Sequence, residues 1–334
     1  MNAVINNEWS TLTAPQALAL HAPVATAALN DLIAASAVLD EQPRLAALQR
    51  EICAQTLSLT ALAHSQSSES GAHIANWRTS DIYNADERVA LAFAEQLSID
   101  VSSVDESLRA QFLQSFGAQA FPVAIATYIA DFTPRLRRTL EQLFRPAAEG
   151  WVAMEGDAAV NKDAVANKNA QADFVTVFME FLRVVYNMRG LDPVLTELVR
   201  LRGARQHQCR MCKSLRAHSA LAAGADDAAF AAVDHYADSD LLSTRQKAAL
   251  ALTDAMIWQP GFISDTVIEG IHQNFSPAEA VELVLDIMRN AANKPAVALG
   301  SDAASSDSVQ VYDIDEAGQM HIGLERPVPV APVR

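Results

Sequence analysis

The fold is decided by one stretch of sequence, residues 197–224, which reads ELVRLRGARQHQCRMCKSLRAHSALAAG. Its first part has apolar residues at helical spacing, which predicts a helix that runs on from Glu197. From Cys209 onward the pattern predicts a new helix that ends at Gly224, since glycine is common at helix C-termini. The stretch therefore predicts two successive helices with a C-x-x-C motif where they meet.

The two cysteines of this motif and a downstream arginine fall on one face of the second predicted helix. At about 100° per residue, Cys212 lies about 60° from Cys209, and Arg216 lies within about 20° of Cys209. The free amides of a first helical turn and the Arg216 cation both stabilise a thiolate. A thiolate in that position can attack a peroxide or a disulfide, and the second thiol can then close an intramolecular disulfide. The motif therefore predicts dithiol redox chemistry.

Two other interpretations of the cysteine pair stay open. A zinc site needs four ligands, and His207 and His218 are the local candidates beside the cysteines, but the helical count points His218 away. Alternatively, both cysteines are buried and inert, as small apolar residues of a helical core. For His207 we expect a solvent-facing position in the loop before the motif.

The composition of the whole chain fits a helical protein with two domains. Its 334 residues exceed the usual size of a single core, and 12 glycines and 13 prolines are few for that length. The net charge of -15, without a dense basic run, argues against nucleic-acid and anionic-membrane partners. No signal peptide or long apolar span is evident, and only three cysteines occur, so we expect a cytoplasmic protein.

Two changes in composition divide the chain. Residues 147–172 are rich in Ala, Asn, Lys and Asp and have no apolar stripe, which indicates a linker. They separate a helical domain at 1–146 from a second helical domain at 173–300. Residues 301–334 alternate apolar and polar side chains before a Pro-rich end, which predicts a hairpin and a tail. The hairpin would serve either as a clasp between subunits or as an edge packed on its own domain.

The two helical halves resemble each other. Residues 86–96 (DERVALAFAEQ) and 244–256 (TRQKAALALTDAM) each place a charged first turn before an amphipathic pattern. An offset of 159 residues aligns Phe116 with Phe275, and an offset of 152 fits the region upstream. The pattern predicts an internal repeat, with a loop seven residues longer in the second copy.

Together these features resemble the AhpD-like and carboxymuconolactone decarboxylase superfamily. Its redox members carry Glu, eleven residues, C-x-x-C, three residues and His, and Glu197, Cys209 and Cys212 match at that spacing. The segment LDPVLTELVRLRGAR before the motif and NAANKPAVALG at 290–300 are also similar to family helices. The resemblance covers residues 174–300 and extends more loosely to the first half. It implies an all-α fold of two AhpD-like helical repeats with a short C-terminal β-hairpin extension.

The resemblance also implies roles for the motif residues in an alkylhydroperoxidase-like dithiol oxidoreductase. Cys212 would attack the peroxide, Cys209 would resolve the product, and Glu197 would begin a proton relay. Arg216 stands where the family has His; arginine keeps its proton, so it would stabilise a thiolate, bind an anion or pair with Glu197 instead. The family implies an external thiol or lipoyl reductant and a homo-oligomer. Because the sequence has no Gly-rich phosphate loop, no tightly bound organic cofactor is expected.

The first half departs from the motif. Its aligned positions hold, in the order of the motif, Leu45, Leu57, Thr60 and His64. This half therefore cannot perform dithiol chemistry, and we expect His64 to be an ordinary core or surface histidine. The third cysteine, Cys53, is expected to be an ordinary buried thiol.

Two other functions stay open. A decarboxylase-like enzyme would hold the carboxylate of a lactone substrate with Arg216 or Arg205, and its activity would survive alkylation of the thiols. A non-catalytic helical binding or scaffold protein would form no peroxide-driven disulfide and would retain a partner on isolation. The substrate is accordingly expected to be a small peroxide or a small carboxylated molecule.

Overall fold

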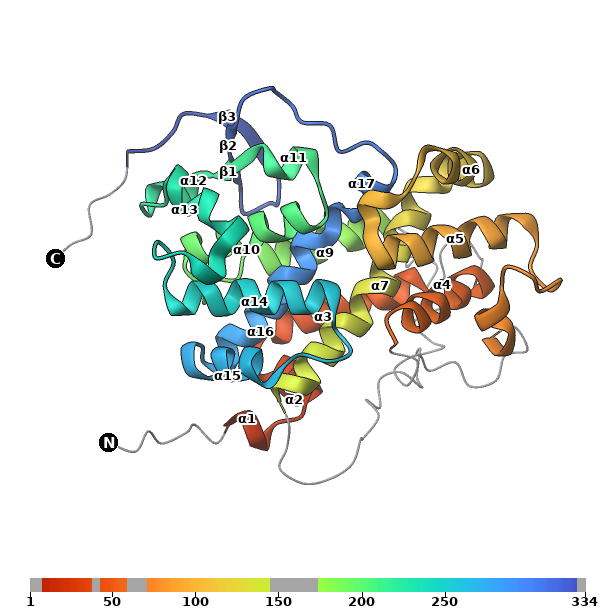
Figure 1. Ribbon diagram of the computed structural model, residues 1–334, viewed down its shortest axis with the longest axis horizontal. Coiled ribbons are helices and arrows are strands. Elements are labelled where there is room, and N and C mark those ends of the chain that lie inside the picture. Colours follow the sequence, from red (N-terminus) through yellow and green to blue (C-terminus); the bar gives the residue numbers. More distant parts are fainter. Residues whose placement is uncertain (1–7, 38–42, 59–70, 145–173, 329–334) are drawn as a thin grey trace.

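The computed structural model describes residues 8–37, 43–58, 71–144 and 174–328. Helices make up most of this part of the chain, and a small sheet lies at its C-terminal end, so the predicted all-α class with a short β extension is confirmed (Figure 1). The predicted linker at 147–172, together with Thr60 and His64, lies outside the described residues. The α-helices are α1 (Glu8–Thr11), α2 (Ala14–His21), α3 (Pro23–Ser36), α4 (Pro43–Thr56), α5 (Ala85–Asp100), α6 (Glu106–Phe116), α7 (Ala120–Leu143), α9 (Phe174–Tyr186), α10 (Pro193–Gln206), α11 (Arg210–Lys213), α12 (His218–Ala222), α13 (Asp227–Ala232), α14 (Thr244–Trp258), α15 (Asp265–Asn274), α16 (Pro277–Asn290) and α17 (Lys294–Ala298).

Polar side chains cap the first turns of several helices. In α5, Asn84 accepts a hydrogen bond from the backbone N–H of Glu87, and the Glu87 carboxylate accepts one from the N–H of Asn84. Ser243 and Gln246 form the same capping box at the start of α14. Because such caps satisfy amides that have no partner within the helix, both predicted helices begin within two residues of the expected position.

The helices of the two halves repeat in the same order. Shifted by the predicted 159 residues, the first residues of α5 and α6 coincide with the first residues of α14 and α15. The packing is also equivalent: α4 lies against α5 and α7, and α10 lies against α14 and α16. The order and pairing of the helices therefore agree with the internal repeat that the sequence predicts.

The two halves share one hydrophobic core. Figure 1 shows the red N-terminal helices among the green and blue helices of the second half, and α3 packs along α9 while α2 packs on α16. The long helix α7 contacts elements of both halves, and its buried Tyr128 donates a hydrogen bond to the carbonyl of Met288 at 2.6 Å. The largest buried cluster contains residues of both halves, such as Trp9 and Leu32 of the first and Leu198 and Met288 of the second. The N-terminal helices therefore complete the core of the second half.

The C-terminal segment forms a three-stranded sheet. The strands are β1 (Leu215–Ala217), β2 (Gln310–Ile314) and β3 (Met320–Leu324), in the order β1-β2-β3. β2 and β3 are antiparallel and form the predicted hairpin, whose turn uses Gly318 at φ +85°. β1 pairs with β2 in parallel and was not predicted. Tyr312 is the buried residue of β2, and it fixes the hairpin on the second half.

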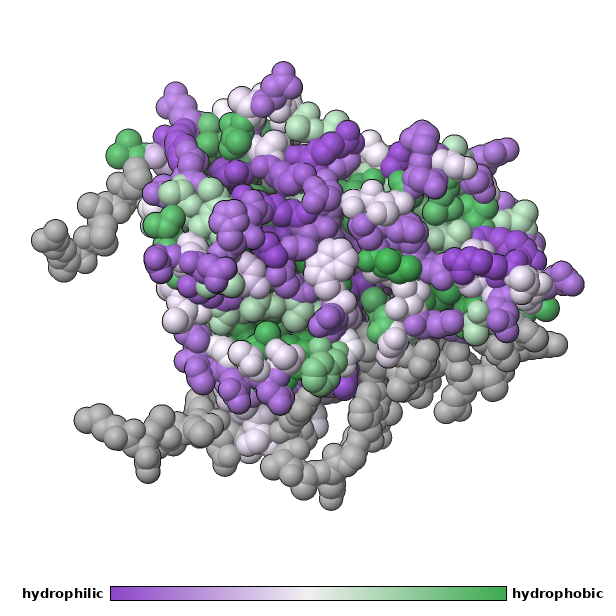
Figure 2. All heavy atoms as spheres, in the orientation of Figure 1, coloured by the Kyte–Doolittle hydropathy of each residue, from purple (hydrophilic) through white to green (hydrophobic). Residues whose placement is uncertain are grey.

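The visible surface is mostly polar. In Figure 2 hydrophilic side chains cover much of the face around α10 and α11, and hydrophobic side chains form smaller patches. Within the described ranges no single helix has the length and apolar character to cross a membrane; α2 and α3, bent by 119°, meet that test only as a pair.

Candidate functional site

The cysteine pair lies at the junction between α10 and α11. The side chain of Asp192 caps the N-terminus of α10, because it accepts a hydrogen bond from the N–H of Leu195 at 2.9 Å. The helix ends at Gln206, just before the loop that carries Cys209. Cys209 caps the short helix α11, and its Sγ accepts the N–H of Cys212 at 3.2 Å. The two cysteines are joined as a disulfide, with their Cα atoms 5.3 Å apart. Both are buried, but Cys212 is 6% exposed and Cys209 1%.

Asp302, which follows the last helix of the second half, holds the loop around the cysteines by hydrogen bonds and an ion pair. The Asp302 carboxylate accepts the N–H of Arg210 at 2.8 Å and pairs with its guanidinium at 2.6 Å, and the Asp302 carbonyl accepts the N–H of Met211. These bonds satisfy two amides of the first turn of α11. Although burial raises the pKa of Asp302, the bonds from Arg210 outweigh it and hold that pKa below its ordinary value. Nothing in the sequence pattern singled out Asp302.

The helix predicted from Cys209 to Gly224 is wrong. The helical turn stops at Lys213, and the chain then extends as β1 before it turns into α12. In a continuous helix the carbonyls of Cys212 and Leu215 would accept amides four residues on; here Arg200 donates to both, each at 2.9 Å. Pairing of β1 with β2 then holds the extended conformation. The predicted shared helical face of Arg216 and the thiols is therefore wrong as well.

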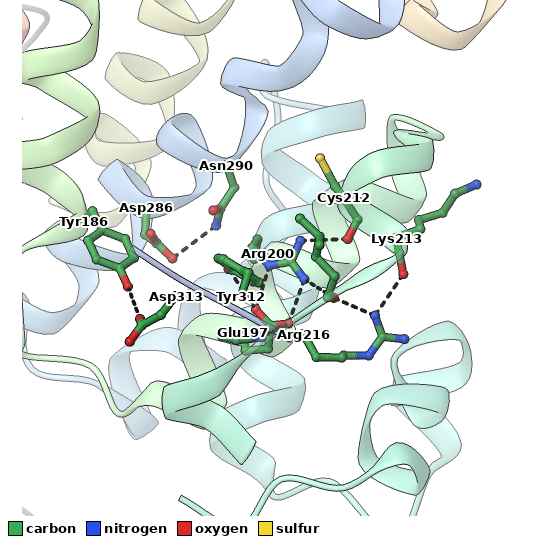
Figure 3. Close-up of polar contacts among 12 residues, drawn as sticks. Tyr186, Glu197, Arg200, Cys212, Lys213, Arg216, Asp286, Asn290, Tyr312 and Asp313 are labelled. Carbon is green, nitrogen blue, oxygen red and sulfur yellow. Dashed lines mark hydrogen bonds and ion pairs between the residues drawn. The ribbon is translucent and has the colours of Figure 1, made fainter. Parts of the chain in front are cut away.

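Glu197 and Arg200 form a buried clamp beneath the cysteines (Figure 3). The two guanidinium nitrogens Nε and Nη2 of Arg200 donate to the two Glu197 oxygens at 2.6 and 2.7 Å. Glu197 also accepts the Ala217 N–H at 3.1 Å and the Tyr312 hydroxyl at 3.4 Å. Burial alone would lower the pKa of Arg200, but the Glu197 charge raises it above its ordinary value. The clamp ties α10, β1, β2 and the Cys212 carbonyl together.

Arg216 does not pair with Glu197, which corrects a second expectation. Its Nη1 donates to the carbonyls of Lys213 and Leu215 at 2.9 and 2.7 Å, and its guanidinium lies 5.1 Å from the centre of the Phe230 ring. Burial and the nearby Arg200 cation lower the pKa of Arg216. The structure thus links Glu197 to the Cys212 carbonyl through Arg200, and the disulfide joins Cys209 to Cys212, whereas Arg216 makes no bond to Glu197 and lines a pocket beside β1.

A second buried polar group, which we call the buried ion cluster, lies between the halves and was not predicted. Asp131 pairs with Arg135 at 2.8 Å and with Lys294 at 2.5 Å, and all three side chains are almost fully buried. Burial lowers the pKa of Lys294 to about 8. The sequence around Asp131 and Arg135, VAIATYIADFTPRL, could have indicated a buried ion pair, because two opposite charges four residues apart interrupt an otherwise apolar helix.

Two further residues of the sequence analysis adjoin this cluster. Cys53 is fully buried and unbridged, as expected, and burial raises its pKa to about 12. His207 was expected in solvent but is 6% exposed, edge-on to Phe132, and its Nε2 has no hydrogen-bond partner in the described part of the chain. Burial, helped by the cations Lys294 and Arg135, holds the pKa of His207 well below its ordinary value. The next residue, Gln208, turns the backbone with φ +55° between His207 and Cys209.

The cysteines share their apolar surroundings with the first half. Cys209 and Cys212 belong to a buried cluster with residues of α4, α5, α6, α7 and α17, including Phe93, Phe112 and Val297. Leu45, which aligns with Glu197 in the predicted repeat, belongs to the same cluster. The degenerate half therefore covers the cysteine pair with apolar side chains. Across the described ranges, no three His, Cys, Asp or Glu side chains are grouped so as to hold a metal ion.

Comparisons with known proteins find two relatives that this chain matches over their whole length. The uncharacterized protein Rv2313c of Mycobacterium tuberculosis strain H37Rv and the uncharacterized protein MT2376 of strain CDC 1551 are each 40% identical to it over 303 residues, which cover 90% of this chain and all of theirs. The uncharacterized protein YnjA of Escherichia coli K12 is 34% identical over 70 residues, 21% of this chain and 38% of that protein. No protein-family model and no solved structure matches the chain. Since the match spans the whole of both mycobacterial proteins, this chain belongs to the same family as Rv2313c and MT2376.

Proposed function

We propose that the protein is a cytoplasmic dithiol oxidoreductase of the AhpD-like superfamily that reduces peroxides through Cys212 and Cys209. The observation that carries the proposal is that the fold brings the two C-x-x-C sulfurs within disulfide-bonding reach of each other, which such a reaction requires. The greater exposure of Cys212 supports its role as the attacking thiol, and the burial of Cys209 suits a resolving thiol.

The proposed reaction uses two electrons from the cysteine pair. The Cys212 thiolate attacks one peroxide oxygen, the O–O bond breaks, and the departing alkoxide takes up the proton that the Cys212 thiol released. Cys209 then attacks the sulfur of the Cys212 sulfenic acid, which closes the disulfide and releases water. An external thiol or lipoyl dithiol returns two electrons and two protons to the pair. No tightly bound organic cofactor takes part.

In this proposal Glu197 and Arg200 are positioning residues. Arg200 holds the Cys212 carbonyl, and Glu197 holds Arg200 through two bonds. Exchange of Glu197 would therefore change the placement of Cys212 relative to Cys209. A proton relay that begins at Glu197 stays a prediction, because every bond recorded for its carboxylate goes to Arg200, Ala217 or Tyr312.

The test is peptide mass mapping without reduction, on reduced protein treated with one equivalent of peroxide. We expect a rapid and selective link between Cys209 and Cys212, while Cys53 stays free. Cys212→Ser should abolish peroxide consumption, and the matched variant Cys53→Ser should consume peroxide at the wild-type rate. Slow oxidation spread over all three cysteines, or undiminished turnover by Cys212→Ser, would contradict the proposal.

A second candidate is the decarboxylase-like enzyme, which one observation favours. Arg216 and Arg205, the two arginines named for a substrate carboxylate, line the same pocket. This activity would not use the thiols. Turnover of a carboxylated lactone that persists after complete alkylation of Cys209 and Cys212 would support it over the dithiol proposal.

A further inference from the structure

An arginine-lined pocket lies beside β1, and none of its lining residues is Glu197, Arg200 or a cysteine. It has a volume of about 560 Å³ and lies between Arg205 of α10, the helices α12 and α13, and the strands β2 and β3. Pockets of about 300–1,000 Å³ bind small organic molecules in many proteins. We call it the arginine pocket, after its three basic lining residues, Arg205, Arg216 and Arg326.

The charges of the arginine pocket favour an anion. Three guanidinium groups face one lining carboxylate, Asp227, in a chain whose net charge is -15. Asp227 pairs with Arg326 at 3.0 Å, and both side chains are exposed at the rim. Arg205 pairs with Asp234 at 2.7 Å. After these pairs are formed, one cation of the pocket has no partner carboxylate.

That cation is Arg216. Among the described residues no carboxylate forms an ion pair with it, and its buried Nε has no hydrogen-bond partner. Its Nη1 is held by two backbone carbonyls and its plane lies over the Phe230 ring, so the guanidinium is fixed before any ligand arrives. A half-buried guanidinium that forms no ion pair is destabilising, and an oxygen anion in the pocket, hydrogen-bonded to the guanidinium, would relieve that cost.

Apart from Gln310, the rest of the wall is apolar. The hydrophobic residues that line the pocket come from α12, α13 and the hairpin, and they are Leu221, Ala231, Val309, Val311 and Leu324. A bare inorganic anion would leave this surface uncovered, whereas an organic anion would place its hydrocarbon part there.

We propose that the arginine pocket binds a small organic carboxylate, with the carboxylate on Arg216 and the hydrocarbon body against the hairpin wall. The site is the pocket named above for the decarboxylase-like candidate; it is separate from the cysteine pair, and the binding proposed here depends neither on the dithiol function nor on turnover of a lactone. The site adjoins the segment that follows Cys212. Arg216 donates to the carbonyls of Lys213 and Leu215 in that segment, on either side of Ser214.

Titration calorimetry on the full chain tests this inference with four probes: benzoate, hexanoate, inorganic phosphate and the neutral benzamide. We expect both carboxylates to bind, and phosphate and benzamide to bind at least tenfold more weakly. Arg216→Gln should weaken benzoate binding by about tenfold or more, because one charge-assisted contact is lost. The control Arg78→Gln, whose arginine lies outside the pocket, should bind benzoate as the wild type does.

A second variant tests the pocket without altering Arg216, in case Arg216→Gln disturbs the fold. Leu324→Glu adds a negative charge to the wall at a residue that is 38% exposed, and it should also weaken benzoate binding. The same titration on the Cys209→Ser, Cys212→Ser double variant should be unchanged, which separates this site from the dithiol proposal. The inference is overturned if neither carboxylate binds, if Arg216→Gln binds benzoate as tightly as the wild type, or if phosphate or benzamide binds as tightly as benzoate.

Discussion

At the scale of single residues, Glu197 pairs with Arg200, and Arg200 in turn holds the carbonyl of Cys212. Sequence spacing singled out Glu197 and both cysteines as candidates, because their separations along the chain are explicit in the motif, and the structure places them near one another. It assigned the wrong arginine, because the position of Arg216 depends on the path of the chain after Cys212. Arg200 lies three residues after Glu197 on the same helix, where side chains always meet, so its pairing was available from the sequence.

Removal of one partner of the buried Glu197–Arg200 pair should strongly destabilise the fold. Glu197→Gln leaves the buried Arg200 charge without its carboxylate, and we expect the free energy of unfolding to fall by about 3–5 kcal/mol. Denaturant unfolding followed by circular dichroism measures this change. The matched variant Glu106→Gln breaks the exposed pair with Arg109 and should leave the midpoint unchanged. Equal effects of the two variants would show that Glu197 is not a structural anchor.

His207 should make the fold sensitive to acid. Its pKa lies well below 6.5 in the fold, so below pH 6.5 the unfolded chain binds a proton that the folded chain does not. The free energy of unfolding should therefore fall with decreasing pH, by up to about 1.4 kcal/mol per pH unit. His272, whose pKa burial also lowers, adds in the same direction.

Thermal unfolding between pH 5 and pH 7 tests the role of His207. His207→Gln should flatten the pH dependence without abolishing it, since His272 remains. An unchanged slope in His207→Gln would contradict the prediction.

At the scale of elements, local signals predicted the helices and the hairpin but not β1. The helices α5 and α14 carry capping boxes and amphipathic patterns within a few residues, and the hairpin carries its own alternation and turn. β1 has three residues, and its partner strand begins at Gln310, far along the chain. Its extended form depends on that distant strand and on Arg200, so no local pattern could predict it.

Two glycines should respond in opposite ways to alanine. Gly318 has φ +85° in the hairpin turn, and a Cβ there would lie 3.1 Å from Arg183 Cγ, so Gly318→Ala should destabilise the fold by about 1–2 kcal/mol. Gly203 lies within α10, with no atom within 4 Å of an added Cβ, so Gly203→Ala should stabilise by about 0.5–1 kcal/mol. Denaturant midpoints compare the two variants, and the same sign for both would contradict the assignment.

At the scale of the whole molecule, the two repeated halves behave as one structural unit because they share a core. The sequence predicted the repeat from matching helical patterns, but patterns within each half do not reveal which helices pack across the halves. The contacts of α3 with α9 and of α2 with α16 are of that kind. The buried ion cluster joins the halves as well, through Asp131 of α7 and Lys294 of α17.

The shared core predicts a single cooperative unfolding transition. Far-ultraviolet circular dichroism and tryptophan fluorescence should give coincident denaturation curves. Leu32→Ala empties a fully buried position of α3 and should lower the free energy of unfolding by about 2–5 kcal/mol, with both probes shifted together. Leu20→Ala, at an exposed residue of α2, should leave both curves in place. Two separate transitions would mean that the halves unfold independently.

The parallel pairing of β1 with β2 also constrains the order of events during synthesis. The ribosome makes α10 before the hairpin, so Glu197 and Arg200 exist in the nascent chain well before Tyr312 does. The stretch that follows Cys212 must wait for β2 to emerge before it acquires its strand partner. Chains stalled before residue 310 should therefore keep Cys209 and Cys212 open to alkylating reagents, and released chains should protect them.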